Sequence, residues 1–292
     1  MTDTALQLEL ASRAGGEAGI KAAAVHARRR RTVLLRLTQV AVAVVIFGGW
    51  QWFTTENWLD PFFYGQPSGI WHSLVHLFTK GTEFGSIWDD LGVTLREAVY
   101  GFGLGALVGV FFGLVLGQSR FLADVLGPYI KIVNAVPRII LGSIFLVAFG
   151  LGTLPKVLLA AVLVFFIVFF NAFQGVREVN PNLVANLKVL GASPVQMARH
   201  VTIPSALTWI IASLHTAFGF AIIGALVGEV LGSQRGMGLI ISQAQNRFDP
   251  DTVFACMAIM AVVTLVAEFL ISRFERRVLS WRPPTHTAAA GI

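Results

Sequence analysis

Long apolar runs are the feature that most constrains this chain, because several of them are long enough to cross a membrane. A membrane-spanning helix needs roughly 20 mostly apolar residues, and such runs lie at residues 33–53, 93–117, 132–150, 154–173, 207–231 and 253–274. Hydrophobic residues make up 55% of the 292-residue chain and charged residues 13%, whereas soluble domains carry about 25% charged residues. The sequence therefore predicts an all-α integral membrane protein with one span for each of these runs.

The third run, residues 132–150, is the weakest of these candidates because Asn134, Pro137 and Arg138 lie near its start. A proline inside a helix removes a hydrogen bond and crowds the preceding turn, so Pro137 predicts either a kink or the end of a surface helix before the span. A kinked helix can act as a gate. Arg138 lies about a turn and a half after the inner end of this run and can extend to the interface along its aliphatic stem, which favours a structural role, and a position that faces a pathway is the alternative.

Basic residues are distributed unequally between the two sides that this topology creates. The segments assigned to the inside hold the cluster at residues 28–31 and most other arginines, whereas the outer connections hold Lys80, Lys156, Arg235 and Arg247. Since basic residues favour the cytoplasmic side, the asymmetry predicts that both termini and the connection between the fourth and fifth runs are cytoplasmic. The net charge of +6 therefore reflects topology and predicts no nucleic-acid partner.

The remaining segments organise around one membrane core. Residues 1–32 lack a sustained apolar face and predict a disordered cytoplasmic tail, and residues 33–53 predict a first span at the edge of the protein. Residues 54–92 predict an outer connection with an amphipathic helix, because Ile70, Trp71, Leu74 and Val75 recur with helical spacing. Residues 93–274 form the core, and residues 275–292 a cytoplasmic tail.

Glycine recurs every four residues along the second run. A glycine column of this kind exposes the backbone and lets another helix approach closely. Packing within one subunit is the favoured interpretation, and a pore-lining role is the alternative. The column consists of Gly101, Gly105, Gly109, Gly113 and Gly117.

Acidic residues within apolar runs are costly and are therefore functional candidates. Glu229 lies near the outer end of the fifth run between Gly228 and Gly232. It either faces a translocation pathway or pairs with an outer arginine such as Arg235, and the two interpretations are balanced. Glu268 lies near the inner end of the sixth run with Arg273 close by, which favours a structural role.

Enzyme signatures are missing from the sequence. It has no Gly-Lys pair and hence no GxxxxGK[ST] phosphate loop, so any ATP and its Mg²⁺ must be bound by another chain. Cys256 is the single cysteine, which excludes an intramolecular disulfide. His72 and His76 are four residues apart, but two ligands are too few for a closed metal site, so we expect no metal.

A polar segment interrupts the apolar runs between the fourth and fifth spans. It covers residues 176–206, and its central part reads NPNLVANLKVLGASPVQMARHVTIP at 180–204. Apolar residues alternate with polar ones, which predicts short amphipathic helices broken at Gly191 and stopped at Pro204. We expect a docking element for a cytoplasmic partner, and the alternative is a loop whose apolar residues rest on the lipid headgroups.

The letters LGASP at 190–194 followed by VTIP at 201–204 resemble the EAA loop of binding-protein-dependent ABC importer permeases, in their nitrate, sulfonate and taurine branch. VPR at 136–138 with FGLG at 149–152, and GEV at 228–230 with RGMG at 235–238, support this resemblance. It covers about residues 66–283. The chain departs from the family where Ala185, Asn186 and Leu187 replace the usual Glu-Ala-Ala, which places the family's acidic contact in doubt.

The resemblance implies a type I importer permease fold and a set of partners. These partners are a cytoplasmic ATPase subunit that binds ATP and Mg²⁺, a second permease copy, and an extracytoplasmic solute-binding protein, in a bacterial inner membrane. Substrates would be sulfonate, taurine, nitrate or related small molecules, and Pro137, Arg138 and Glu229 are candidates for the pathway or gate. The implied ATPase-coupling residues are Leu183, Val184, Ala185, Leu187, Leu190, Gly191, Ala192, Ser193, Met197, Arg199 and Pro204.

Two other classes of function stay open at this point. An ion-driven secondary transporter would use Glu229 and Glu268 as proton carriers, although no inverted halves are discernible. A membrane anchor or assembly factor would explain the glycine column but not Glu229. Neither of these classes requires the organised polar segment.

Overall fold

The computed structural model describes residues 30–179 and 181–278. Every regular element in these ranges is helical, apart from an isolated bridge between Thr82 and Gly85, so the predicted all-α class is confirmed. Of the expected tail at residues 1–32, residues 1–29 lie outside the described residues. The chain divides into a first unit ending at Ser68 and a second unit beginning at Gly69.

The first unit contains one long apolar helix, Arg30–Thr55, and the short helix α2, Pro61–Tyr64. The side chains of the long helix are largely exposed within the chain, as expected for a span that faces lipid. Near its end Trp52, Phe53 and Trp58 pack together with ring centroids 5.2–6.1 Å apart. Asp60 caps α2 by accepting a 2.9 Å hydrogen bond from the Phe62 amide.

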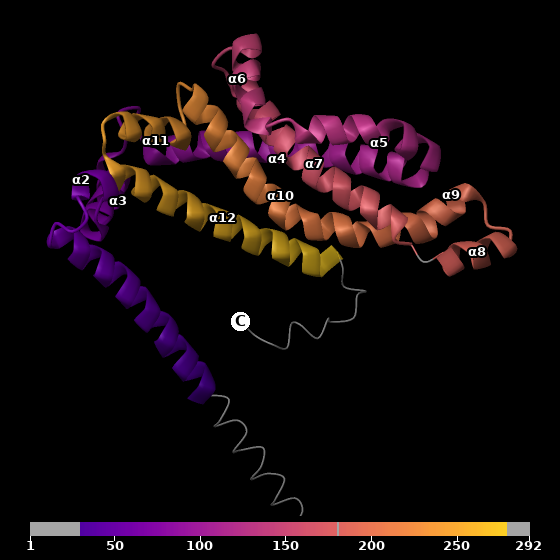
Figure 1. The fold of residues 1–292 in the computed structure, drawn as a ribbon, viewed down its shortest axis with the longest axis horizontal. Coiled ribbons are helices and arrows are strands. Elements are labelled where there is room, and N and C mark those ends of the chain that lie inside the picture. Colours follow the sequence, from indigo (N-terminus) through magenta and orange to yellow (C-terminus); the bar gives the residue numbers. More distant parts are fainter. Residues whose placement is uncertain (1–29, 180, 279–292) are drawn as a thin grey trace, which may run out of the picture. The chain divides into compact units, whose positions relative to one another are not determined.

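Three long helices form the centre of the second unit. They are α4 (Ile87–Gln118), α7 (Thr153–Arg177) and α10 (Ile203–Leu231), which pack against one another (Figure 1). These helices carry most of the buried apolar residues. Helix α3 (Pro67–Lys80), which lies where the amphipathic outer helix was expected, contributes Leu77 and the half-buried Ile70 and Leu74 to the same core.

The glycine column of α4 packs along α7 within the same chain. A Cβ at Gly113 would come within 2.7 Å of the Phe169 carbonyl oxygen, and one at Gly109 within 2.9 Å of the Phe165 carbonyl oxygen. Gly101, Gly105 and Gly117 make equivalent contacts one or two turns away. The column therefore lets the two backbones approach more closely than any other residue would allow.

The region of the third predicted span consists of two helices in place of one. Helix α5 (Arg120–Ala135) is followed by α6 (Arg138–Phe149), and the two are bent by 82° at Val136 and Pro137. In Figure 1, α6 turns away from the direction of α4 and α7. The kink expected from Pro137 is present, but the helix before it begins at Arg120 and not near residue 132. The early part was missed because α5 is amphipathic and carries Asp124 and Lys131.

Helices α8 (Pro181–Val189) and α9 (Pro194–Met197) form the polar segment. They lie beyond the end of α7 and the start of α10 (Figure 1). After α10, helix α11 (Met237–Asn246) leads to α12 (Pro250–Val278), so helix extends into the expected C-terminal tail of 275–292. The described residues hold five helices that could cross a membrane, or six if α5 and α6 together form one span.

Candidate functional site

Gly191 ends the first helix of the polar segment, as expected. Its φ of +77° lies in the left-handed region, which glycine adopts without the penalty that a Cβ brings. The Ala192 amide donates a 3.0 Å hydrogen bond to the Leu187 carbonyl, which is the contact that closes a helix C-terminus of the Schellman type. The chain therefore turns sharply at Gly191.

Ser193 begins the next turn of helix. The Gln196 amide donates to the Ser193 hydroxyl over 3.2 Å, and the Ser193 amide donates to Oε1 of Gln196 over 2.8 Å. This reciprocal pair is a capping box. The spacing Ser-x-x-Gln at 193–196 is the sequence signal of such a box, and the sequence analysis missed it. Ser193 therefore organises the start of α9.

Apolar side chains of the polar segment are left uncovered by the rest of the chain. Val189 is 88% exposed, Leu190 80% and Val195 75%. Leu183, Ala185, Gly191, Ser193 and Arg199 are also exposed, Leu187, Ala192 and Met197 are half-buried, and the side chain of Val184 lies outside the described residues. Exposed apolar groups that are gathered on one segment mark an interaction surface.

Pro204 does not stop a helix as the sequence analysis expected. It lies in the first turn of α10, directly after a π-helical turn at Ala198–Thr202. A proline interrupts the regular hydrogen bonding of a helix, and here the irregular π-helical turn lies directly before it. The helical backbone thus continues from the polar segment into the fifth span, with a candidate span of Val195–Leu231.

A second group of candidate residues lies at the opposite end of the central helices. We call Asp90, Thr94, Glu97, Lys156 and Glu229 the outer polar cluster, and all five are buried. The Thr94 hydroxyl lies 2.8 Å from Oε1 and 3.0 Å from Oε2 of Glu229. The cluster joins the start of α4 and α7 to the end of α10.

The outer polar cluster also holds the N-terminus of α11. The amide of Gly236 donates to Asp90 over 3.3 Å, that of Met237 to Thr94 over 2.9 Å, and that of Gly238 to Glu229 over 2.6 Å. The first amides of a helix have no partner within the helix, so side chains from α4 and α10 replace a local cap. A Cβ at Gly236 would meet the Glu229 carboxylate.

Lys156 supplies positive charge inside the outer polar cluster. Its ammonium group donates to the carbonyls of Leu151 over 2.5 Å and Gly152 over 2.7 Å, and it lies within electrostatic reach of Glu97 and Glu229. The sequence analysis counted Lys156 with the outer connections and did not foresee its burial. Lys156 is buried in the first turn of α7, where the aliphatic stem packs on Gly228.

Glu229 was found by the sequence analysis, but its partners were not. Among the described residues it bonds Thr94 and the Gly238 amide and does not pair with Arg235. Asp90, Thr94 and Glu97 were missed, although their spacing of four and three residues places them on one face of a helix. Oε2 of Glu97 is buried and has no hydrogen-bond partner among the described residues, which also contain no cluster of three metal-ligating side chains.

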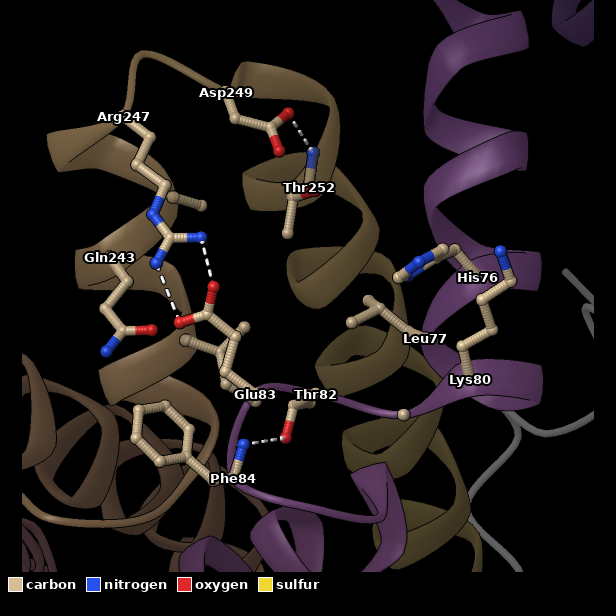
Figure 2. Close-up of a pocket in the computed structure, with 13 residues that line it drawn as sticks. His76, Leu77, Lys80, Thr82, Glu83, Phe84, Gln243, Arg247, Asp249 and Thr252 are labelled. Atoms are coloured by element: carbon tan, nitrogen blue, oxygen red, sulfur yellow. Dashed lines mark hydrogen bonds and ion pairs between the residues drawn. The ribbon is translucent and has the colours of Figure 1, made fainter.

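A polar pocket of about 350 Å³ lies between α3, the 81–86 turn and the α11–α12 connection (Figure 2). The two terminal guanidinium nitrogens of Arg247, Nη1 and Nη2, each donate to the Glu83 carboxylate over 2.7 Å. These hydrogen bonds and the adjacent positive charge hold the pKa of Glu83 below its usual value. His76 and Lys80 approach the pocket from α3 in the same view.

Arg138 lies at the break of the third span. Its guanidinium donates to the side-chain carbonyl of Asn134 and stacks over the Phe166 ring with a centroid distance of 4.6 Å. It is the first residue of α6 and follows the whole of α5.

Residues 105–280 match the family model described as binding-protein-dependent transport system inner membrane component. The chain is 32% identical over 198 residues to a Bacillus subtilis (strain 168) protein that carries the name aliphatic sulfonates transport permease protein SsuC, covering 68% of this chain and 72% of that one. It is 25% identical over 265 residues to the taurine transport system permease protein TauC of Escherichia coli (strain K12), covering 88% and 95%.

Solved structures support the same fold. An amino acid ABC transporter with histidines matches with a TM-score of 0.52 and 24% identity, covering 65% of this chain and 93% of the other. The MetNI methionine ABC transporter in an inward-facing conformation matches with a TM-score of 0.53 and 19% identity, covering 66% and 94%. Helical architecture, family model and relatives favour an importer over an ion-driven secondary transporter, and the chain belongs to the inner membrane permease family of binding-protein-dependent ABC importers.

Proposed function

We propose that the polar segment, residues 176–206, docks into a cytoplasmic ABC ATPase subunit that binds ATP and Mg²⁺. The observation that carries this proposal is the exposure of Val189, Leu190 and Val195 on an ordered helix–turn–helix. Such residues need a partner in water. Because the helical backbone runs on into α10, a movement imposed on the segment would reach the fifth span as a rigid body.

The outer polar cluster then serves as the outer closure of the transport path. It joins α4, α7, α10 and α11 in one buried network, and in this conformation Glu229 is packed inside it. Glu229 is accordingly a gate residue whose bonds break and form as access alternates. Pro137 allows α6 to swing relative to α5, and Arg138 lies at that hinge.

The permease works as a pair, with the exposed apolar residues of α5 and α6, among them Phe121, Ile132 and Val147, facing a second copy. A solute-binding protein delivers cargo to the face that holds the Glu83–Arg247 pair. Both termini and the polar segment are cytoplasmic, because basic residues concentrate on those parts of the sequence. The names of the relatives point to small sulfonates, including taurine, as the first substrates to test.

The docking proposal is tested by affinity purification of the tagged permease from its native membranes, followed by mass spectrometry. We expect an ATPase subunit with a GxxxxGK[ST] motif to co-purify, and to be lost from the variant with both Val189→Asp and Leu190→Asp. Asn186→Asp adds a charge to the same helix at an exposed polar position, and should retain the ATPase. A double variant that retains the ATPase in full would contradict the docking role of α8.

A further inference from the structure

An unneutralised cation lies at the break between α5 and α6. The described partners of Arg138 are the neutral Asn134 amide and the Phe166 ring. Ion pairs in the described part of the chain join His215 to Glu275 and Arg247 to Glu83, and none includes Arg138. Charged residues inside a membrane span are costly and usually face a partner or a solute path.

The chemistry of this group favours an oxyanion. A guanidinium presents several donors in one plane, which matches the oxygens of a carboxylate or sulfonate. Asn134 engages one terminal nitrogen, Nη2, of Arg138, so donors remain for a ligand. The Phe166 ring beneath it fixes the guanidinium plane by a cation–π contact.

An apolar cavity of about 210 Å³ begins at the same phenylalanine. Its walls come from α4, α5 and α7, and they expose no polar surface to the cavity. An engineered and enclosed apolar cavity of roughly 150 Å³ holds a benzene molecule. The cavity here is open on one side, where Tyr129 and Val133 are exposed, and it has room for a small hydrocarbon group. Residues that define it include Phe112, Leu126, Val133, Phe165 and Phe166.

One wall of the cavity is a stack of aromatic rings. Phe165 and Phe169 stack with centroids 5.5 Å apart, and Phe165 also meets Phe112 edge to face at 6.5 Å. Aromatic stacks of this kind are stiff and hold their shape. A hydroxyl-rich ligand such as a sugar would lose its hydrogen bonds to water there without replacement.

We propose that Arg138 and the Phe166-lined cavity together bind an organic anion with a small apolar body, which is the transported solute on its way through the permease. Phe166 connects the two parts, because it lines the cavity and carries the guanidinium on its ring. The anionic head bonds to Arg138 and the apolar body enters the cavity. This inference rests on the proposed transport function and adds a residue-level basis for selectivity to it.

The test uses the full-length permease in nanodiscs of zwitterionic phosphatidylcholine, with butanesulfonate, methanesulfonate and 1-butanol as probes. Calorimetric titration should give tighter binding for butanesulfonate than for either of the others, because each of those lacks one half of the recognised chemistry. Arg138→Gln should weaken butanesulfonate binding by about tenfold or more, the usual loss for a charge-assisted hydrogen bond, with Arg138→Lys intermediate. Arg120→Gln removes an exposed arginine from the same broken span and should leave binding unchanged.

Leu126→Phe tests the cavity independently of the charge. Filling the cavity should weaken butanesulfonate more than methanesulfonate, whose apolar part is a single methyl group. Equal binding of butanesulfonate to the original protein, Arg138→Gln and Leu126→Phe would overturn the proposal. If Arg138→Gln is not recovered from membranes, Arg138→Lys and Leu126→Phe decide the question, since both retain a cation at position 138.

An anionic lipid shares the chemistry of the proposed solute. Nanodiscs that contain phosphatidylglycerol provide the comparison. The proposal would be overturned in favour of a lipid site if the original protein retained this lipid, Arg138→Gln lost it, and butanesulfonate did not bind. Co-purification of the ATPase is measured on the same samples. A permease that binds its ATPase but no sulfonate overturns this inference alone, whereas failure to bind any ATPase overturns the proposed function.

Discussion

Thr94 is the residue on which the outer polar cluster depends most directly. Its hydroxyl bonds the Glu229 carboxylate at 2.8 Å and accepts from the Met237 amide at 2.9 Å. It therefore connects α4 with α10 and with α11. All of these groups are buried, so the removal of one hydroxyl leaves the Met237 amide without this partner and, among the described residues, the Glu229 carboxylate with the Gly238 amide alone.

We expect Thr94→Val to lower the free energy of unfolding by about 1–3 kcal/mol, the range for leaving buried polar groups unsatisfied. Thermal unfolding in mild detergent measures this change. Thr264→Val is the control, because the Thr264 hydroxyl bonds only the Met260 carbonyl of its own helix at 2.8 Å in the described structure. Equal shifts for the two variants would show that Thr94 contributes no more than a local helix contact.

The Glu83–Arg247 ion pair should make the stability of the protein depend on pH. The pKa of Glu83 is lowered by the hydrogen bonds and charge of Arg247, so the pair contributes stability above the usual glutamate pKa and loses it as pH falls through the lowered value. The contribution is small because both groups are exposed to solvent. The difference in unfolding temperature between the original protein and Glu83→Gln should therefore be greatest near neutral pH and vanish in acid, and a difference that grows on acidification would contradict this sign.

At the scale of elements, the glycine column sets the distance between α4 and α7. Gly113→Ala would place a methyl group 2.7 Å from the Phe169 carbonyl oxygen and 2.6 Å from Ala172, so the helices must separate. We expect a loss of about 1–3 kcal/mol, as for other overpacked sites, seen as a lower unfolding temperature. Gly103→Ala is the matched control on the same helix, since nothing lies within 4 Å of its added Cβ; a larger effect at Gly103 would argue against the column.

Some helices and turns could be predicted from the sequence, and others could not. Hydropathy predicted the long helices, and the glycine at 191 predicted a break that a φ of +77° explains. The start of α5 could not be found in this way, because Arg120, Asp124 and Lys131 hide an amphipathic helix from a search for apolar runs. The capping box at Ser193 was readable from its spacing alone.

The outer polar cluster shows what the sequence could not provide. Its bonds join Thr94 to Glu229 and Asp90 to Gly236, which are 135 and 146 positions apart. A single sequence identifies each buried charge as costly but does not pair groups so distant along the chain. The burial of Lys156 was not foreseen for the same reason, because the carboxylates of Glu97 and Glu229 come near it only when α4, α7 and α10 pack.

At the scale of the whole molecule, the polar segment and the outer polar cluster lie at opposite ends of the same helices. Helix α10 connects them, since it follows the π-helical turn at its start and carries Glu229 near its end. A displacement of the polar segment is therefore transmitted along one continuous helix. The proposed coupling requires a stiff polar segment at one end of α10 and a network that can open at the other end.

Gly191→Glu tests this transmission. The substitution would place a residue with a Cβ at a φ of +77°, which is unfavourable. It would also add charge beside the exposed Leu190, so we expect the polar segment to lose its fixed turn. We expect the reconstituted importer to retain ATP hydrolysis while solute uptake falls at least about tenfold, as measured by ATPase and uptake assays on the same proteoliposomes. Asn186→Glu is the control, because it adds the same charge to helix α8 at an exposed polar position with ordinary helical backbone. Normal uptake by Gly191→Glu would mean that the turn at Gly191 does not carry the coupling, and a loss of uptake in both variants would assign the effect to charge and not to backbone geometry.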